Sequence, residues 1–373
     1  MQRFGNSHNE TKISGGFALY TGFIMLTMPS LIRTLTPQCL IHLAHIAKMV
    51  AVLITFVFSA LAVRWLSVGF AARLAIDLPN QRSLHSRPIP RTGGLGVAAG
   101  VVCGWLLAGV VLPASLWLGA TVLVLMSFLD DRYGLPTALR FVLHGLVAIW
   151  LVMSLGVAPG WAVPAVLAIV WMTNLYNFMD GADGLAGGMA VSGFVAYALV
   201  LLLHGQADLG HAALLVAVAA AGFLLFNFPP ARVFMGDAGS ISLGFLAAGF
   251  GLLGIIRAVW PFWFPLLVFA PFVLDATVTL LRRGLRGEKV WQAHKQHYYQ
   301  RLIQMGWSHK RMALVAYALM LGSAGVAVLM LMLAGVAAYG LGGLWLLLLA
   351  VLMRRVDKRW LLFANQQPGT AWQ

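Results

Sequence analysis

Long apolar stretches, separated by short polar stretches, run through most of the chain. Windows of about 17 to 25 apolar residues predict helices long enough to cross a bilayer. The chain has about eleven such windows, at residues 49–72, 93–112, 114–130, 138–156, 162–179, 185–205, 209–226, 240–258, 262–283, 312–335 and 337–353. A β-barrel would show short alternating segments instead. The pattern predicts an all-α polytopic membrane protein with about eleven transmembrane helices.

Composition supports this fold class. Hydrophobic residues make up 61% of the chain and charged residues only 10%, which is far more apolar than a soluble domain. The 40 glycines suit closely packed membrane helices. The two cysteines, Cys39 and Cys103, have no metal-ligand spacing. We expect one transmembrane domain over residues 49–353 and a cytoplasmic C-terminal tail over 354–373.

The first 48 residues fit this pattern poorly. Residues 17–32 are apolar, but Pro29 interrupts them, and a clean helix begins only at Met49. Our hypothesis is that residues 1–48 are a dispensable extension or an over-extended start. The alternative is a twelfth hydrophobic segment.

The distribution of positive charge predicts which side the loops face. The chain carries a net charge of +14. With the N-terminal side outside, nearly all Lys and Arg residues fall in loops on one side, at 73–92, 130–138, 180–184, 227–240 and 284–311 and in the tail, while the opposite loops offer Arg257. The positive-inside rule makes the basic side cytoplasmic, in contact with anionic membrane lipids. This placement explains the charge without nucleic-acid binding.

Acidic residues gather at the predicted cytoplasmic helix ends. Five of the eleven form three clusters: Asp130 with Asp131, Asp180 with Asp183, and Asp237. A carboxylate at this depth is costly unless it is paired, hydrated or bound to a cation, so these acids are candidates for one functional site. The alternative is ordinary helix capping by Asp180, Asp183 and Asp237.

Such a site would suit phosphoryl transfer. Mg²⁺ prefers one or two carboxylates together with substrate oxygens, and Mn²⁺ is an alternative ion. Basic residues would hold the remaining phosphate charge. The flanking loops supply them as Arg82, Arg87, Arg91, Arg140 and Arg232.

Five ordered motifs carry a family resemblance. They are Arg82-Ser83-Leu84-His85 through Gly94, Asp130-Asp131 with Leu135, Asn177 through Leu185, Phe234 through Ser240, and Lys295-Gln296-His297 through Gly306. On these motifs the chain resembles the polyprenyl-phosphate N-acetylhexosamine-1-phosphate transferase family, over roughly residues 49–353. The resemblance implies ten or eleven spans around a cytoplasmic active-site cleft. It also implies transfer of a sugar 1-phosphate from a UDP-N-acetylhexosamine to undecaprenyl phosphate with release of UMP.

The resemblance also implies roles for individual residues. Its catalytic carboxylates would be Asp130, Asp131, Asp180 and Asp183. We expect Asp130 to be the base and Asp131 to be a metal-side or orienting group. The metal ligands would be Asp237 and Asn177. The substrate contacts would be Arg82, His85, Arg91, Arg140, Asn177, Asn227, His294 and His297.

Two departures bear on the branch of the family. Many members carry a His-x-His-His triplet in the last cytoplasmic loop, where this chain keeps His297 and has Tyr299 and Gln300 instead. Arg140 stands where members carry a Lys. The loop resembles the branch that initiates O-antigen chains in the bacterial inner membrane more than the lipid I synthases. We expect the product to start O-antigen or another envelope polysaccharide, with a homodimer as an option.

Other functions remain as alternatives. A secondary transporter would place its acids near the bilayer midplane, often in repeated halves. Another Mg-dependent intramembrane transferase would use denser aspartate spacings. Asp275, inside the ninth predicted helix, either faces the cleft or pairs with a basic or hydroxyl group on a neighbouring helix.

Overall fold

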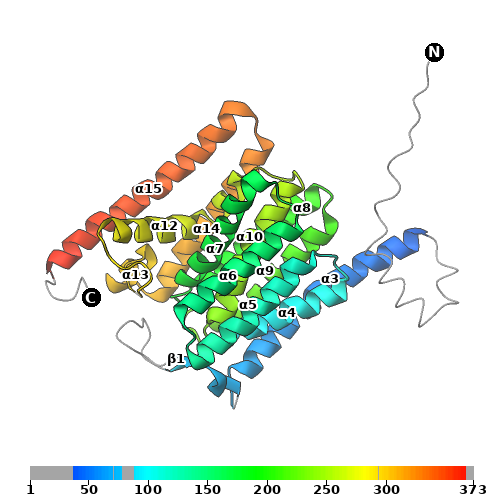
Figure 1. The fold of residues 1–373 in the computed structure, drawn as a ribbon, viewed down its shortest axis with the longest axis horizontal. Coiled ribbons are helices and arrows are strands. Elements are labelled where there is room, and N and C mark those ends of the chain that lie inside the picture. Colours follow the sequence, from blue (N-terminus) through cyan, green and yellow to red (C-terminus); the bar gives the residue numbers. More distant parts are fainter. Residues whose placement is uncertain (1–36, 70, 78–87, 293, 367–373) are drawn as a thin grey trace.

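The computed structural model describes residues 37–69, 71–77, 88–292 and 294–366. Long helices dominate this part of the chain (Figure 1). They are α3 (Pro37–Leu66), α4 (Gly93–Ala108), α5 (Ala114–Tyr133), α6 (Thr137–Ser154), α7 (Pro159–Phe178), α8 (Leu185–Leu203), α9 (Ala207–Asn227), α10 (Asp237–Ile256), α11 (Trp263–Val268), α12 (Ala270–Leu285), α13 (Tyr298–Gln304), α14 (His309–Met332) and α15 (Gly335–Gln366).

Among the described residues, nine helices are long and apolar enough to cross a membrane. They are α3, α5 to α10, α14 and α15. The apolar helix α4 is shorter, and α11 and α12 together occupy the ninth predicted window. The prediction of an all-α polytopic membrane protein is therefore confirmed.

The ninth predicted helix is divided at Phe269. It forms α11 up to Val268 and α12 from Ala270 onward. Pro271 lacks a backbone N–H, and its ring would clash with the carbonyl of Leu267 in a continuous helix. The proline is tolerated because it lies in the first turn of the new helix.

Several helix ends differ from the predicted windows. The first helix ends at Leu66 rather than at residue 72, because Gly69 adopts a left-handed conformation with φ +61°. It also begins at Pro37, so residues 37–48 are its first turns. Helix α5 continues to Tyr133, which places both predicted acids in its last turn. Helix α15 continues to Gln366, so residues 354–366 are helical.

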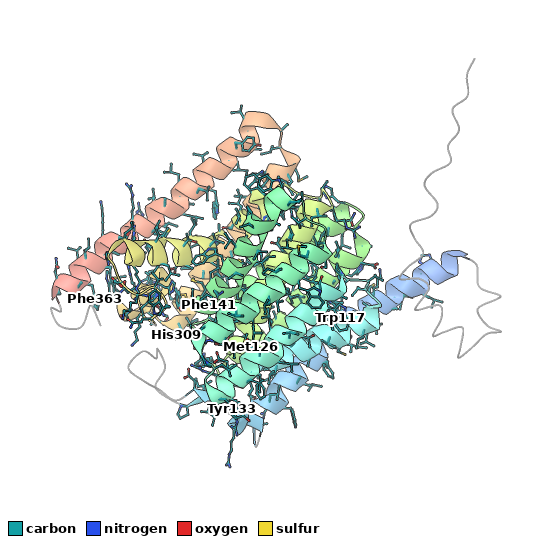
Figure 2. The ribbon with its side chains drawn as sticks, in the orientation of Figure 1. Trp117, Met126, Tyr133, Phe141, His309 and Phe363 are labelled. Atoms are coloured by element: carbon teal, nitrogen blue, oxygen red, sulfur yellow. The ribbon has the colours of Figure 1, made fainter. Side chains whose placement is uncertain are left out.

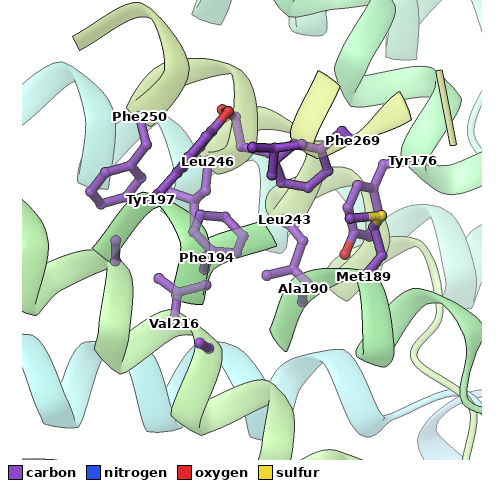
Figure 3. Close-up of a cluster of buried hydrophobic side chains, with 14 of the residues drawn as sticks. Tyr176, Met189, Ala190, Phe194, Tyr197, Val216, Leu243, Leu246, Phe250 and Phe269 are labelled. Carbon is purple, nitrogen blue, oxygen red and sulfur yellow. The ribbon is translucent and has the colours of Figure 1, made fainter. Parts of the chain in front are cut away.

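The core lies around α8, α9 and α10. Figure 3 shows aromatic side chains meeting there, including Phe194 and Tyr197 of α8 and Phe250 of α10. Tyr176 of α7 and Phe269 join them, and all five side chains are almost fully buried. Helices α6 and α15 instead expose many large apolar side chains, as expected of surfaces that face lipid.

Two short strands and a turn of 3-10 helix lie beside the helices. Residues Ala71–Leu74 form the turn η1, and β1 (Ile76–Asp77) pairs antiparallel with β2 (Ile89–Pro90). In Figures 1 and 2, β1 lies at the lower side of the bundle, where Tyr133 at the end of α5 also lies. Asp130 and Asp131, in the last turn of α5, belong to this end.

Candidate active site

Backbone hydrogen bonds fix where α10 begins. The N–H of Phe234 donates to the carbonyl of Pro90 at 2.7 Å. The N–H groups of Gly93 and Gly94 then donate to the carbonyls of Phe234 at 2.9 Å and Met235 at 2.8 Å. The loop before α10 therefore lies along the start of α4, although the two segments are far apart in sequence.

Gly236 brings two acids together at the start of α10. Its φ is +72°, and a Cβ atom there would lie 2.5 Å from the Arg91 carbonyl and 2.9 Å from Asp131 Oδ2. Only glycine fits both the conformation and the space. The next residue, Asp237, donates its backbone N–H to Asp131 Oδ2 at 3.1 Å. The positive end of the α10 dipole thus lies against the Asp131 carboxylate.

Arg91 lies between two carboxylates. Its guanidinium is 2.9 Å from Asp77 Oδ1 and 3.8 Å from Asp131 Oδ1. Burial alone would lower the pKa of Arg91, but the charges of Asp77, Asp131 and Asp237 more than offset this and raise it. Arg91 is thus a permanent cation beside the acids.

Arg140 joins the first and last acidic clusters. Its Nη1 lies 2.6 Å from Asp130 Oδ2 and 3.6 Å from Asp237 Oδ2. The other oxygen of Asp130 accepts the N–H of Leu135 at 2.7 Å. Both oxygens of Asp130 are therefore engaged by strong donors.

Asn177 supports Asp237 from the end of α7. Its Oδ1 accepts a hydrogen bond from Ser240 Oγ at 2.9 Å, and its side chain also hydrogen-bonds to Asp237. Ser240 lies one turn after Asp237 on α10. This contact fixes the rotamer of Asn177 and ties α7 to α10.

Asp180 completes the group of carboxylates from the turn between α7 and α8. Burial raises the pKa of Asp180 well above its ordinary value. The negative charges of Asp237 and Asp131 raise this pKa further, whereas the positive charge of Arg91 lowers it. An added cation would relieve this repulsion. We call Asp131, Asp180 and Asp237 the acidic centre, and residues 179–184 the Asp180 turn.

Asp183 is held by other partners. Its Oδ1 lies 3.1 Å from His309 Nδ1, and its Oδ2 accepts the N–H of Ala231 at 3.0 Å. Burial would raise the pKa of Asp183, but these hydrogen bonds outweigh it and lower the pKa. Asp183 thus joins the Asp180 turn to the start of α14 and to the loop before α10.

Asn227 also joins these segments. Its Oδ1 accepts the N–H of Gly184, and its Nδ2 donates to the carbonyl of Val233, each at 2.8 Å. Tyr317 of α14 donates its hydroxyl to the Gly184 carbonyl at 2.8 Å. The buried Asn227 side chain therefore braces the backbone around the acidic centre.

The two predicted histidines lie beside the Asp180 turn. His297 is buried, stacks on Phe178, and places Nδ1 3.1 Å from Asp275 Oδ1. The ring centroids of His294 and His297 are 4.8 Å apart. Burial, followed by the nearby charges, lowers the pKa of His294 to about 3, so His294 is neutral at neutral pH. Asp275 thus pairs with a histidine, the second of its two predicted roles.

The structure brings together most of the predicted residues and adds others. The residues that converge from α5, α6, α7, α10 and the intervening loops are Asp130, Asp131, Asp180, Asp237, Asn177, Arg91 and Arg140. Arg82 and His85 lie outside the described residues. Sequence reasoning missed Ser240, which is part of a quoted motif, and Tyr299, whose hydroxyl donates to the carbonyl of Phe178.

The donors of the acidic centre suit a hard divalent cation. Within the described ranges, no group of three or more His, Cys, Asp or Glu side chains is placed so that it could hold a metal ion by itself. Mg²⁺ does not need one, because it binds through one or two carboxylates and completes its shell with water and substrate oxygens. Asp237 and Asp180 offer such oxygens, and Asn177 orients Asp237. Direct binding of the metal by Asn177 remains a prediction.

Comparisons with known proteins show which family the chain resembles. Residues 113–255 match the family described as glycosyl transferase family 4. The chain is 33% identical to a probable undecaprenyl-phosphate N-acetylglucosaminyl 1-phosphate transferase of Bacillus subtilis, over 72% of this chain and 82% of the relative. It is 30% identical to a decaprenyl-phosphate N-acetylglucosaminephosphotransferase of Mycobacterium tuberculosis, over 66% of this chain and 74% of the relative. It is 29% identical to an undecaprenyl-phosphate alpha-N-acetylglucosaminyl 1-phosphate transferase of Escherichia coli, over 63% of this chain and 71% of the relative.

Proposed function

The chain belongs to glycosyl transferase family 4, and from this membership and the geometry of its site we propose that it transfers N-acetylhexosamine 1-phosphate from a UDP-sugar to undecaprenyl phosphate. The reaction would release UMP and leave the sugar on a polyprenyl diphosphate. The names of the relatives make UDP-N-acetylglucosamine the first donor to test.

One observation carries this proposal. Carboxylates from α5, α10 and the Asp180 turn gather around Arg91 and Arg140 at the edge of an apolar helical bundle. A lipid phosphate held at the membrane surface and a soluble nucleotide diphosphate could both reach such an edge. The arginines would bind phosphate oxygens that the metal leaves free.

The chemical step needs a group that accepts a proton. An oxygen of the lipid phosphate forms a bond to the β-phosphorus, the bond from that phosphorus to the bridging oxygen breaks, and UMP leaves with that electron pair. We assign the proton of the lipid phosphate to Asp131 rather than to Asp130, the base that the sequence favoured. Both oxygens of Asp130 are already engaged, one by Arg140 at 2.6 Å and the other by the backbone N–H of Leu135 at 2.7 Å.

Mg²⁺ would be held by Asp237 and Asp180, with Mn²⁺ as an alternative, and would neutralise charge on the diphosphate. Asn177 holds Asp237 in place for this role. Arg140 approaches the same carboxylate from the other side. The protein's own contribution is therefore to fix the position of one metal ligand from two sides.

The proposed function is tested with purified protein, undecaprenyl phosphate, Mg²⁺ and a panel of UDP-N-acetylhexosamines. We expect UMP release that depends on both the lipid and the metal. A protein that purifies folded but releases no UMP with any donor would rule the proposal out.

Direct attack can be separated from a covalent route. A phospho-enzyme would form before the lipid arrives, so labelled UMP would exchange into the UDP-sugar without any lipid. We expect no such exchange. An exchange rate comparable to turnover, measured without lipid, would overturn direct attack.

We further propose that the site faces the cytoplasm at a bacterial inner membrane, where the product would start O-antigen or another envelope polysaccharide. The positive-inside rule supports the orientation. The variant motif at His297, Tyr299 and Gln300 supports the branch. Analysis of lipid-linked sugars in cells that lack the gene would test this assignment.

A further inference from the structure

The short helix α13 contacts the Asp180 turn directly. Tyr299 is 5% exposed, and its hydroxyl donates to the carbonyl of Phe178 at 3.1 Å, at the start of the turn. A Cβ atom at Gly181 would collide with the same hydroxyl. Tyr299 and the turn are therefore packed without spare room, next to Asp180.

Asp275 of α12 fixes the start of α13. Its carboxylate accepts the N–H groups of Tyr298 at 3.0 Å and Tyr299 at 3.2 Å, and His297 Nδ1 lies 3.1 Å from it. These N–H groups have no partner within a helix, so a buried carboxylate satisfies them and the helix dipole together. Such a short helix needs this tertiary support.

Asp357 of α15 fixes the outer face of α13. It accepts hydrogen bonds from Arg282 at 2.8 Å, Arg301 at 3.0 Å and the Tyr298 hydroxyl at 3.1 Å. The guanidinium of Arg301 also lies over the rings of Tyr298 and Trp360. Arg301 is buried, so removing the Asp357 charge would leave it without its carboxylate.

We propose that α13 is a clip that positions the acidic centre, with Tyr299 as the residue that holds the Asp180 turn and Asp357 as the anchor that holds α13. This inference rests on the proposed function. Neither residue touches the reacting atoms. Each acts by holding the Asp180 carboxylate in position relative to Asp131 and Asp237.

Steric suppression tests the contact between Tyr299 and the turn. Tyr299→Phe removes one hydrogen bond, so we expect kcat to fall about fivefold, with little change in the KM for undecaprenyl phosphate. Gly181→Ala should reduce kcat further, because the new methyl group meets the hydroxyl. The double variant should recover part of that loss. Tyr339→Phe, an exposed tyrosine at the start of α15, is the control and should match wild type.

A double variant no more active than Gly181→Ala would overturn the contact. So would a Tyr299→Phe protein that keeps the wild-type kcat.

The anchor is tested by Asp357→Asn, with Asp357→Glu as the conservative variant and Lys358→Gln as the matched control on an exposed neighbouring position. Amide hydrogen exchange over residues 179–184 is the readout, because a loose clip should expose this turn. We expect faster exchange and lower kcat in Asp357→Asn, partial recovery in Asp357→Glu, and no change in Lys358→Gln.

Wild-type exchange over 179–184 in both Asp357→Asn and Tyr299→Phe would overturn the clip. The exchange measurement does not depend on turnover. If the wild-type protein releases no UMP with any donor, the proposed function fails while exchange still decides the role of α13.

Discussion

At the scale of single residues, Asp131 and Asp237 are close enough to repel each other. The backbone N–H of Asp237 reaches the Asp131 carboxylate at 3.1 Å, and Arg91 and Arg140 each approach one of the two acids. Donors and cations on the protein thus offset part of the repulsion. The repulsion that remains favours the binding of a divalent cation together with a diphosphate substrate.

Asp237→Asn should therefore abolish turnover while the protein still inserts and purifies. An amide is a neutral and weaker ligand for a hard cation, so we expect less than about a tenth of the wild-type rate at saturating Mg²⁺. UMP release measures the rate. Asp208→Asn is the control, because Asp208 lies at the start of α9 with a half-exposed side chain. A higher residual rate in Asp237→Asn would count decisively against a metal ligand.

The acid limb of the pH–rate profile should respond to Arg91. The pKa of Asp180 is raised by burial and by the neighbouring acids, and the Arg91 charge lowers it. Activity that needs the Asp180 carboxylate rises as pH passes upward through this raised pKa. Arg91→Gln removes the positive charge that lowers the Asp180 pKa, so the acid limb of the profile should move to higher pH. The measurement is kcat/KM against pH, and a limb that stays in place or moves to lower pH contradicts this assignment.

Much of the acidic centre could be predicted from the sequence. Ionisable side chains are rare in membrane helices, so Asp131 and Asp237 of this centre stand out against their apolar surroundings. The contact between Asp183 and His309 could not be predicted in this way. His309 lies far along the chain and is brought near only by the packing of α14 on α8.

At the scale of elements, the crossing of α4 and α10 sets the distance between the acids. A Cβ atom at Gly94 would collide with the backbone of Gly239, and one at Gly239 would lie 2.6 Å from Gly94 Cα. The two glycines let the helix backbones touch. This contact carries Asp237 to the edge of α5, where Asp131 lies.

Gly94→Ala should therefore separate the two helices. Overpacking against backbone costs about 1–3 kcal/mol, so we expect a lower thermal unfolding temperature in detergent together with lower activity. Gly325→Ala in α14 is the matched control, because a Cβ atom there meets nothing within 4 Å. A Gly94→Ala protein as stable and active as this control would show that the crossing tolerates a methyl group.

The helices of the bundle could be predicted from hydrophobicity, whereas α13 could not. The apolar windows locate α5 to α10 within a few residues, because each helix must satisfy its own backbone groups in lipid. Residues 298–304 lie in a polar loop with no apolar window. That helix depends on Asp275, a contact between segments that pattern analysis does not join.

At the scale of the whole molecule, the acidic centre and most of the basic side chains share one end of the bundle. The ends of α5 and α12, the C-terminal half of α15 and the starts of α6 and α14 carry arginines or lysines there. The loop after α10 carries Arg257 at the opposite end. In the proposed orientation, anionic lipid would attract this basic end to the cytoplasmic side of the membrane.

Topology reporters test this orientation. The Asp180 turn and the turn after α12 lie at the end that holds the acidic centre, so fusions after Gly184 or Gly287 should read cytoplasmic. Helices α7 and α9 begin at the other end, so fusions after Pro159 or Gln206 should read external. Between these points α7, α8, α9 and α10 each cross once, and α11 and α12 together cross once, so the four signals must alternate. An external signal at Gly184 would turn the acidic centre away from the nucleotide sugar, and the proposed transfer could not proceed.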